Sequence, residues 1–493
     1  MALESFRINS FIYLDIDGNQ KKSDKLLDLI DISSADIHHS NDYFRILDFL
    51  DQLYIYSHNN NLYISKNIKS FFLYCEKKPV ISTGASELFI DTGFVFAPWT
   101  IYKNVFLMCP GYRFVYNNGN LSIEPDWLVT GQDSFSLPTY RNILTNALRK
   151  SLVKSSGACF TLSGGVDSSI LSYLGKEVAG DNSYTLTTEM DGFKKELGLA
   201  KIVSRQLGWE NIIYRYSAIN NRYQNIIDNF IEETFLPVSD AMVPVVYEML
   251  SSNLKNKDHI IVEGQGADSS CFGLPHNWLL SNYKENLYFI YRILYYLLPS
   301  FQTKSNAFLR NIYRVKKSLY CLSQKNISQS YLSSFTRINC ENPFFRKIMC
   351  YFEHCFENYE SIHHAIAHIL LYLVLPSREM YKYTLPQKEG MKFSLPFLDR
   401  DLIEYSFMTS IENYFSEGNR KKPIYDMGED FFPGLFTKNR TSPYYINYDL
   451  PSKTSNNKKS LIQQLKSKHL RDSEMHIKYD YALNKLEELI ESY

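Results

Sequence analysis

Residues 159–169 read Cys159-Phe160-Thr161-Leu162-Ser163-Gly164-Gly165-Val166-Asp167-Ser168-Ser169, and this stretch decides the fold. A short apolar run is followed by a small polar loop and then by a helical pattern, which predicts a strand, a loop and a helix. That order places free backbone N–H groups and the positive end of a helix at one point, where anionic oxygens bind well. The two glycines let the backbone approach a ligand closely, and the serines add hydroxyl donors.

Asp167 indicates which anion the loop would hold. A carboxylate in the middle of an anion site repels phosphate unless a divalent cation lies between them. The loop therefore predicts a site for the pyrophosphate of a nucleotide with Mg²⁺, and a serine-rich turn that binds nothing is the alternative. The commoner phosphate loop, Gly-x-x-x-x-Gly-Lys-Ser/Thr, is absent from the chain. The candidate nucleotide-binding residues of this loop are Leu162, Ser163, Gly164, Gly165, Asp167, Ser168 and Ser169.

The pattern around the loop predicts an α/β fold. Predicted helices at 139–152, 169–176 and 195–207 alternate with predicted strands at 159–162, 183–188 and 211–216. Such alternation is typical of a doubly wound parallel sheet. Ligands of these sheets bind beyond the carboxyl ends of the strands, which is where the loop lies. From residue 277 onward the pattern is mostly helical.

The first part of the chain is β-rich. A hairpin is predicted at 53–57 and 62–65, and further strands are predicted at 105–108, 112–116 and 121–123. A polar linker follows at about 130–138. We therefore expect two domains, at 1–132 and 136–493.

A second loop carries another carboxylate. Residues 260–268 read Ile260-Ile261-Val262-Glu263-Gly264-Gln265-Gly266-Ala267-Asp268, an apolar strand that ends in a glycine-spaced loop. If this strand neighbours the first, Asp268 meets Asp167 and gives Mg²⁺ two hard oxygen ligands that the phosphates complete. Gly264, Gln265 and Gly266 are then nucleotide-site candidates. The alternative is an ordinary strand-end turn with a capping Asp.

A third segment, Pro396-Phe397-Leu398-Asp399, favours a structural role. It is apolar and extended, and Asp399 is placed to cap a helix that begins just after it.

Composition excludes some classes of partner. Lys+Arg and Asp+Glu number 53 each, so no global field favours nucleic acid or an anionic membrane. The longest apolar stretches, 290–298 and 366–375, are too short to span a bilayer and are predicted to be core helices. The eight cysteines are scattered, which predicts a reduced, cytoplasmic setting. The end of the chain, with Leu483 and Leu486, predicts a peripheral helix.

The three segments, in this order, resemble the asparagine synthetase superfamily, whose pattern is Ser-Gly-Gly-x-Asp-Ser, then Gly-x-Gly-x-Asp, then Pro-Phe-Leu-Asp. The resemblance implies an N-terminal glutaminase-like (Ntn-type) domain and a C-terminal sheet of the adenine nucleotide alpha-hydrolase kind. It also implies ATP and Mg²⁺ as cofactors. Such enzymes adenylylate a carboxylate, release pyrophosphate and let an amine attack, which yields an amide and AMP.

The sequence departs from the superfamily pattern at two positions, and these narrow the choice among its members. A working glutaminase of this type has a Cys at its mature amino terminus, whereas removal of Met1 would leave Ala2 here. We therefore expect a degenerate domain, as in the β-lactam synthetases and lasso-peptide cyclases, where the substrate supplies its own amine. The β-lactam-forming members carry Tyr at position 265, asparagine-forming members Glu and some lasso cyclases His. Gln265 cannot take a proton near neutral pH, which weakens the β-lactam reading.

The resemblance also implies a late lysine that stabilises charge on the adenylate. Residues 437–442, Thr437-Lys438-Asn439-Arg440-Thr441-Ser442, are the segment we select for it, with Lys438 as the choice and Arg440 as the rival. A solvated basic turn is the alternative. Glu389 and Glu263 are both candidates for the general base, and a surface carboxylate is the alternative for each.

Three functions follow. The leading one is an ATP-dependent, AMP-forming ligase that closes an intramolecular amide, of the lasso-peptide cyclase or macrolactam synthetase type. The second is an amidotransferase that uses external ammonia on a small acid, and the third is a non-catalytic nucleotide-binding relative. The expected partners are a peptide or a small carboxylate and amine as substrates, with a precursor peptide and its processing protease for a cyclase. Neither nucleic acid nor a membrane is expected, and a homo-oligomer stays open.

Overall fold

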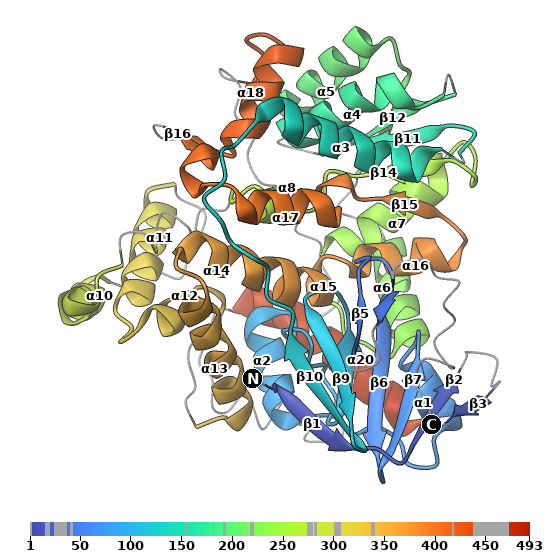
Figure 1. Ribbon diagram of the computed structural model, residues 1–493, viewed down its shortest axis with the longest axis vertical. Coiled ribbons are helices and arrows are strands. Elements are labelled where there is room, and N and C mark those ends of the chain that lie inside the picture. Colours follow the sequence, from blue (N-terminus) through green and yellow to red (C-terminus); the bar gives the residue numbers. More distant parts are fainter. Residues whose placement is uncertain are drawn as a thin grey trace.

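The structure is a computed structural model, and it has a mixed α/β fold in which one parallel sheet is covered by helices on both faces (Figure 1). It describes residues 2–14, 20–23, 37–39, 43–153, 155–180, 182–190, 194–216, 221–273, 280, 283–299, 307–336, 341–416, 419–436 and 473–493.

The N-terminal part contains two five-stranded sheets, in the orders β1-β10-β9-β5-β4 and β3-β2-β7-β6-β8. The predicted hairpin is confirmed, because β6 pairs antiparallel with β7 and the turn residues Asn59 and Asn60 have φ of 49° and 60°. The elements are β1 (Glu4–Arg7), β2 (Ser10–Leu14), β3 (Gln20–Ser23), β4 (Ile37–His39), β5 (Tyr43–Ile46), β6 (Leu53–His58), β7 (Asn61–Ser65), α1 (Lys69–Tyr74), α2 (Thr83–Thr92), β8 (Val105–Met108), β9 (Tyr112–Asn117) and β10 (Asn120–Pro125). The glutaminase-like nature of this part and the domain boundary at 132–136 stay predictions.

The third sheet is parallel throughout and has the order β13-β12-β11-β14-β15. Its elements are β11 (Ala158–Thr161), β12 (Tyr184–Glu189), β13 (Asn211–Arg215), β14 (Ile260–Val262) and β15 (Lys392–Ser394). The chain moves outward from β11 in one direction to β13 and then returns to β14 on the other side. The loops after β11 and β14 therefore diverge at the same edge, and doubly wound sheets bind ligands at this switch point.

Helices cover the two faces because successive strand residues alternate between them. Phe160 faces a core that it shares with α4 (Val166–Val178), whereas Cys159 faces a second core with residues of α7 (Met242–Asn253). The first face also carries α3 (Leu137–Leu152) and α5 (Lys194–Leu207), and the second carries α16 (Tyr381–Lys388). Burial of a side chain such as Phe160 contributes roughly 1.5–3 kcal/mol.

The remaining elements connect these layers, wrap them or extend beyond them. They are α6 (Asn221–Thr234), α8 (Ala267–Ser270), η2 (Glu285–Leu287), α10 (Tyr288–Leu297), α11 (Ala307–Leu322), α12 (Ile327–Phe335), α13 (Pro343–Asn358), α14 (Ile362–Ile369), the π-helix η3 (Leu370–Val374), α15 (Leu375–Arg378), η4 (Pro396–Leu398), α17 (Arg400–Met408), η5 (Ile411–Tyr414), β16 (Phe415–Ser416), β17 (Asn419–Arg420), α18 (Lys422–Phe431) and α20 (Ser473–Glu491).

One of the two predicted core helices is confirmed and the other is wrong. The stretch 366–375 is buried throughout, within α14, η3 and α15. The stretch 290–298 lies mainly in α10, which has no buried residue because α11 covers only one of its sides. No helix in the described ranges has the length and apolarity needed to cross a bilayer.

The last helix is more than a peripheral element. In α20, Leu483 and Leu486 are fully buried, and the helix packs against α6 and against α2 of the N-terminal part. Tyr481 donates a hydrogen bond of 2.6 Å to Asp228 of α6.

Candidate active site

The predicted phosphate loop follows β11 and is held together by its serine hydroxyls. Ser163 Oγ and Ser168 Oγ lie 3.1 Å apart, Ser168 Oγ donates to the carbonyl of Gly165 at 3.1 Å, and the Gly165 N–H donates to Ser163 Oγ at 3.3 Å. Gly165 is the N-cap of α4, so the positive end of this helix lies at the loop. Ser169, in contrast, is fully buried and bonds back to Gly165, which gives it a structural role.

Gly164 has no substitute in this loop. Its φ is +79°, and a Cβ on it would lie 2.1 Å from the carbonyl oxygen of Glu196 in α5. Any side chain would clash with that backbone and strain the left-handed conformation. The loop therefore keeps its shape because it is pressed against α5.

The two predicted metal ligands meet at one point. Asp167, in the first turn of α4, and Asp268, in α8, both pair with the ammonium of Lys421, at 2.8 Å and 2.6 Å. The contact follows from the sheet order, because β11 and β14 are neighbours and their loops touch: a Cβ on Gly264 would lie 3.4 Å from the Ser168 nitrogen.

Sequence reasoning missed Lys421. It lies just before α18 with φ of 57°, and its stem packs over Gly273, where a Cβ would lie 2.4 Å from Lys421 Cε. Burial opposes its charge, but the two carboxylates outweigh burial and raise its pKa, so it is an ammonium at neutral pH. The signal that could have found it is the basic pair Lys421-Lys422 ahead of Pro423.

The third predicted segment, residues 396–399, packs against the loop that precedes Asp268. Gly266 has φ of +96°, and a Cβ on it would lie 2.3 Å from Leu398 Cδ2. Asp399 caps α17 by accepting the Asp401 N–H at 3.0 Å, which confirms the predicted helix cap. The Pro396–Leu398 turn therefore fixes the loop by packing.

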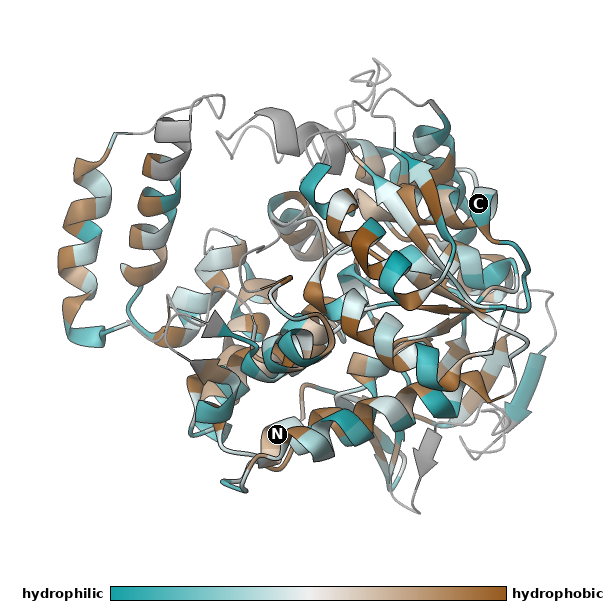
Figure 2. Cartoon of the chain, turned by 90° about the horizontal axis from the view of Figure 1, so that it is seen from above, coloured by the Kyte–Doolittle hydropathy of each residue, from teal (hydrophilic) through white to brown (hydrophobic). Residues whose placement is uncertain are grey.

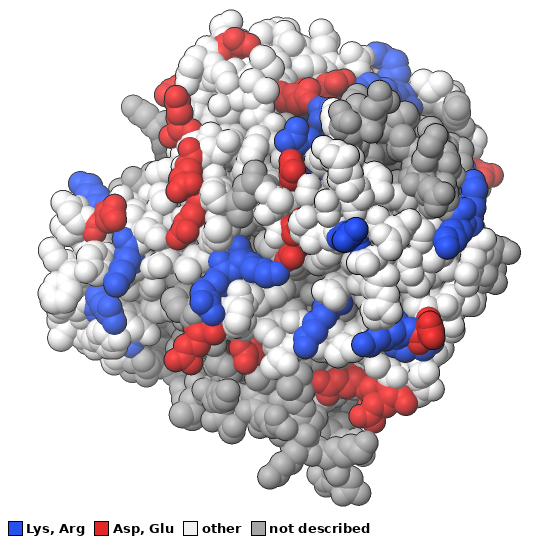
Figure 3. Space-filling model, turned by 60° about the horizontal axis from the view of Figure 1, so that its bottom comes forward, with Lys and Arg blue, Asp and Glu red and all other residues white. Residues whose placement is uncertain are grey.

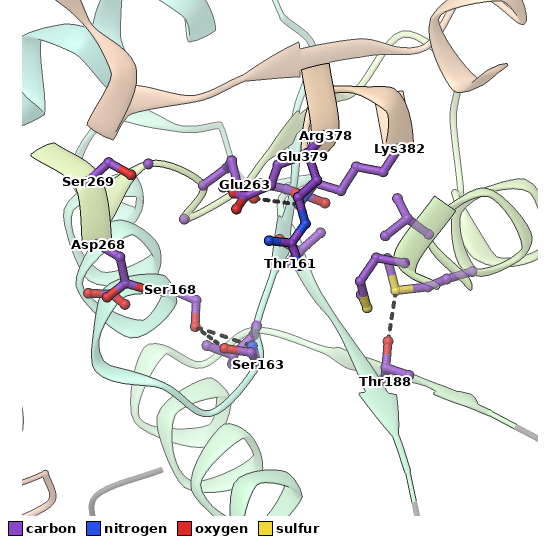
Figure 4. Close-up of a pocket in the computed structure, with 18 of the residues that line it drawn as sticks. Thr161, Ser163, Ser168, Thr188, Glu263, Asp268, Ser269, Arg378, Glu379 and Lys382 are labelled. Atoms are coloured by element: carbon purple, nitrogen blue, oxygen red, sulfur yellow. Dashed lines mark hydrogen bonds and ion pairs between the residues drawn. The ribbon is translucent and has the colours of Figure 1, made fainter. Parts of the chain in front are cut away.

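A cavity of about 550 Å³ opens between the two loops and the helices opposite them (Figure 4). Its size is that of a small-molecule site. Of the candidate nucleotide-site residues, Gly164, Gly165 and Ser169 do not line it. The rest of the lining divides into an apolar part mainly from β12 and α7, a second apolar part from α12 and η3, and a polar part from the loops and the α15–α16 segment. The lining residues are Thr161, Leu162, Ser163, Asp167, Ser168, Leu186, Thr188, Met190, Met242, Val246, Met249, Glu263, Gly264, Gln265, Gly266, Asp268, Ser269, Phe335, Leu370, Val374, Arg378, Glu379 and Lys382.

Gln265 is oriented by a polar network that crosses the cavity. Lys382 Nζ donates to Gln265 Oε1 at 2.8 Å and pairs with Glu263 at 3.0 Å. The amide nitrogen of Gln265 donates to Glu379. Tyr383 closes the network by donating to Glu263 at 2.5 Å. Burial raises the pKa of Glu379, and the cations of Arg378 and Lys382 oppose that shift.

The predicted catalytic residues are not gathered at this cavity. Glu389 is exposed at the end of α16, accepts a hydrogen bond from Tyr247 and does not line the cavity. Lys438 and Arg440 lie outside the described residues. Glu263 does line the cavity, but Lys382 and Tyr383 already engage its carboxylate.

Comparison with known proteins places the chain in a family. No curated protein matches it. Among solved structures, the NH₃-dependent NAD synthetase of Campylobacter jejuni, in complex with nitrate, is 16% identical over 40% of this chain and 96% of its own, with a TM-score of 0.21. The NMN synthetase of Francisella tularensis is 15% identical over 48% of this chain and 93% of its own, with a TM-score of 0.23. The family model for asparagine synthase matches residues 139–491, which is well over half of the chain, and the protein therefore belongs to the asparagine synthase family.

Proposed function

We propose that this protein is a ligase that adenylylates a carboxylate of its substrate with ATP and then closes an amide with an amine of the same substrate, as lasso-peptide cyclases do. Family membership supports an ATP-dependent amide ligase. The observation that carries the finer proposal is the cluster of Asp167, Asp268 and Lys421 beside the Ser163–Gly165 loop, at the switch point of the parallel sheet.

The cavity suits ATP at both of its parts. The N–H groups of the loop and the start of α4 favour phosphate oxygens. The apolar part, with Leu186, Met190 and Met249, offers a surface for the base.

The donor set also fits Mg²⁺. Asp167 and Asp268 are hard oxygen donors that come together and line the cavity, and their carboxylates have lone pairs beyond those that the Lys421 ammonium engages. These two carboxylates would hold Mg²⁺, which would supply positive charge to the phosphates.

In the first step an oxygen of the substrate carboxylate attacks the α-phosphorus, and the bond to the β-phosphate breaks to release pyrophosphate. Negative charge grows on the transferring phosphorus oxygens beside the loop. Lys421 supplies a preorganised cation for that charge, since its ammonium is fixed by Asp167 and by packing on Gly273.

In the second step the amine attacks the acyl carbon, the bond to AMP breaks, and the amine loses a proton. Glu379 is the carboxylate we assign as acceptor of that proton, because it lines the cavity and burial raises its pKa toward the working range. Gln265 orients Glu379 through its amide nitrogen and needs no proton chemistry of its own.

The wall that carries Glu379 favours a peptide over a small polar acid. The π-helix η3 contributes the apolar side chains of Leu370 and Val374 to the cavity, and Phe335 of α12 adds a third. A small acid would need polar partners at these places. Holding amine and acyl-adenylate in one molecule also gives ring closure an advantage of roughly 7–11 kcal/mol.

The test is pyrophosphate release by the full-length protein with ATP and Mg²⁺. Candidate precursor peptides should stimulate release without ammonium, and both Asp167→Asn and Asp268→Asn should abolish it. Release that needs ammonium and a small acid would instead select the amidotransferase. Tight ATP binding with no release under either condition would leave a non-catalytic relative.

A further inference from the structure

The helices α10 and α11 form a hairpin that stands apart from the rest of the molecule, at the left edge of Figure 2. The hairpin is anchored through α12, against which α11 packs. On the inner side of α10, Tyr295 lies 5.4 Å from Tyr320 of α11, and Lys316 of α11 donates to the carbonyl of Leu298 at 2.6 Å. The hairpin is thus a packed unit whose outer side has no neighbour among the described residues.

That outer side is apolar to a degree found nowhere else in the described chain. Fifteen large apolar side chains are exposed in the described chain as a whole, and six of them lie on the ten residues of α10 and two more on α11. Those of α10 are Phe289, Ile290, Ile293, Leu294, Tyr296 and Leu297. Leu297 keeps 73% of its surface exposed and Phe289 keeps 61%. Exposed apolar area of this kind is typical of a surface that binds a protein or a membrane.

The charge of the hairpin is equally uneven. Its described ranges, 283–299 and 307–322, contain six basic residues and one acidic residue, whereas the whole chain is balanced at 53 each. In Figure 3 the projecting left edge shows mostly Lys and Arg among its charged atoms, next to broad uncharged areas. The basic residues are Lys284, Arg292, Arg310, Arg314, Lys316 and Lys317.

We propose that the α10–α11 hairpin docks this protein on an anionic lipid surface. An aromatic and aliphatic helix face combined with basic residues is the composition of interfacial membrane helices. The face is the outer side of a projecting helix rather than a groove, so it suits insertion at the headgroup boundary. A second copy of the chain would fit it less well, because two strongly basic hairpins would repel each other.

Docking of this kind requires neither a spanning helix nor a net charge on the whole chain. It depends on one local patch, which a balanced total conceals. Phe335, at the end of α12, lines the cavity, so the hairpin is joined through α11 and α12 to the wall of the active site. A docked enzyme would hold its cavity in a fixed relation to the lipid surface.

The test is sedimentation of the full-length protein with vesicles. We expect binding to phosphatidylcholine vesicles that contain about 30% phosphatidylglycerol, little binding to pure phosphatidylcholine, and loss of binding in about 0.5 M NaCl. The double variant Phe289→Ser/Leu297→Ser should bind roughly ten-fold more weakly or worse.

The matched control is Val129→Ser/Val153→Ser, which removes two apolar side chains that are equally exposed, at 71% and 72%, but lie elsewhere. This control should bind as the parent does, and both variants should keep the parent's circular dichroism and melting temperature. Absence of binding to anionic vesicles, or equal loss in the control, would overturn the proposal. So would a dimer in light scattering that the Phe289→Ser/Leu297→Ser variant splits, since a second copy would then cover the face.

Discussion

Lys421 pairs with two carboxylates that belong to separate loops. Its removal should therefore have two effects that can be measured separately. In Lys421→Met, pyrophosphate release should fall roughly 100- to 1,000-fold, because the developing phosphate charge loses its cation. At the same time Asp167 and Asp268 lose their partner, so Mn²⁺ should bind the nucleotide-free protein more tightly, as titration calorimetry can measure. Lys422→Met is the matched control, since Lys422 pairs with Asp426 of its own helix. Equal losses in both variants would remove Lys421 from the mechanism.

Glu379 is assigned to the second step alone. Glu379→Gln should keep peptide-dependent exchange of pyrophosphate into ATP, which reports adenylylation, yet slow amide formation roughly 100- to 10,000-fold. Mass spectrometry of the peptide follows the amide, because closure removes one water. The exposed Glu389 serves as the comparison, and Glu389→Gln should leave both steps intact. If Glu379→Gln abolished exchange as well, Glu379 would act in binding or adenylylation instead.

Lys382 sets the pH at which Glu379 can act. A base works above its pKa, so the rate of amide formation should rise with pH through the raised pKa of Glu379. Lys382 lowers that pKa, and Lys382→Met should therefore move the rising limb of the profile to higher pH. A purely structural role for Lys382 would reduce the rate at every pH without moving the limb.

At the scale of elements, the contact between the phosphate loop and α5 can be tested with a matched pair of glycine variants. Gly164→Ala places a methyl group against the Glu196 carbonyl and should weaken ATP binding roughly ten- to hundred-fold, since a strained residue of this kind costs about 1–3 kcal/mol. Gly198→Ala lies in α5 with nothing within 4 Å, and it should instead stabilise the protein by about 0.5–1 kcal/mol. Calorimetric ATP binding and urea unfolding measure the two effects, and tight ATP binding by Gly164→Ala would contradict the packing described here.

The elements around the first loop were predictable because each carries a local pattern. A short apolar run, a glycine-containing loop and a helical pattern predict β11 and α4 to within a few residues. The meeting of Asp167 and Asp268 also followed, since the carboxyl ends of neighbouring parallel strands lie at one edge.

The rest of the site could not be read in this way. Lys421 reaches Asp167 across 254 residues, and Glu379 lies in the turn between α15 and α16, which no local pattern relates to the loops. The exposure of α10 was equally hidden, because an apolar run has the same composition whether or not a neighbour covers it.

At the scale of the whole molecule, two buried histidines should make stability depend on pH. Burial lowers the pKa of His368 to about 3 and that of His364 to about 4, whereas both bind protons near pH 6.5 when unfolded. Below pH 6.5 the unfolded chain therefore binds more protons, and the free energy of unfolding should fall by about 2 kcal/mol per histidine at pH 5. His368→Gln should flatten this slope in urea unfolding, while His354→Gln, which alters a side chain that is 38% exposed, should not. An unchanged slope in His368→Gln would contradict the assignment.

The packing of α20 against α2 has a consequence for synthesis on the ribosome. Residues 83–92 of α2 emerge long before residues 473–493, and at typical rates the interval is on the order of 20–80 s. Throughout that interval the surface that receives Leu483 and Leu486 has no cover from α20. We therefore expect this surface to need shielding, as a chaperone for apolar surface provides, until residues 473–493 have been synthesised.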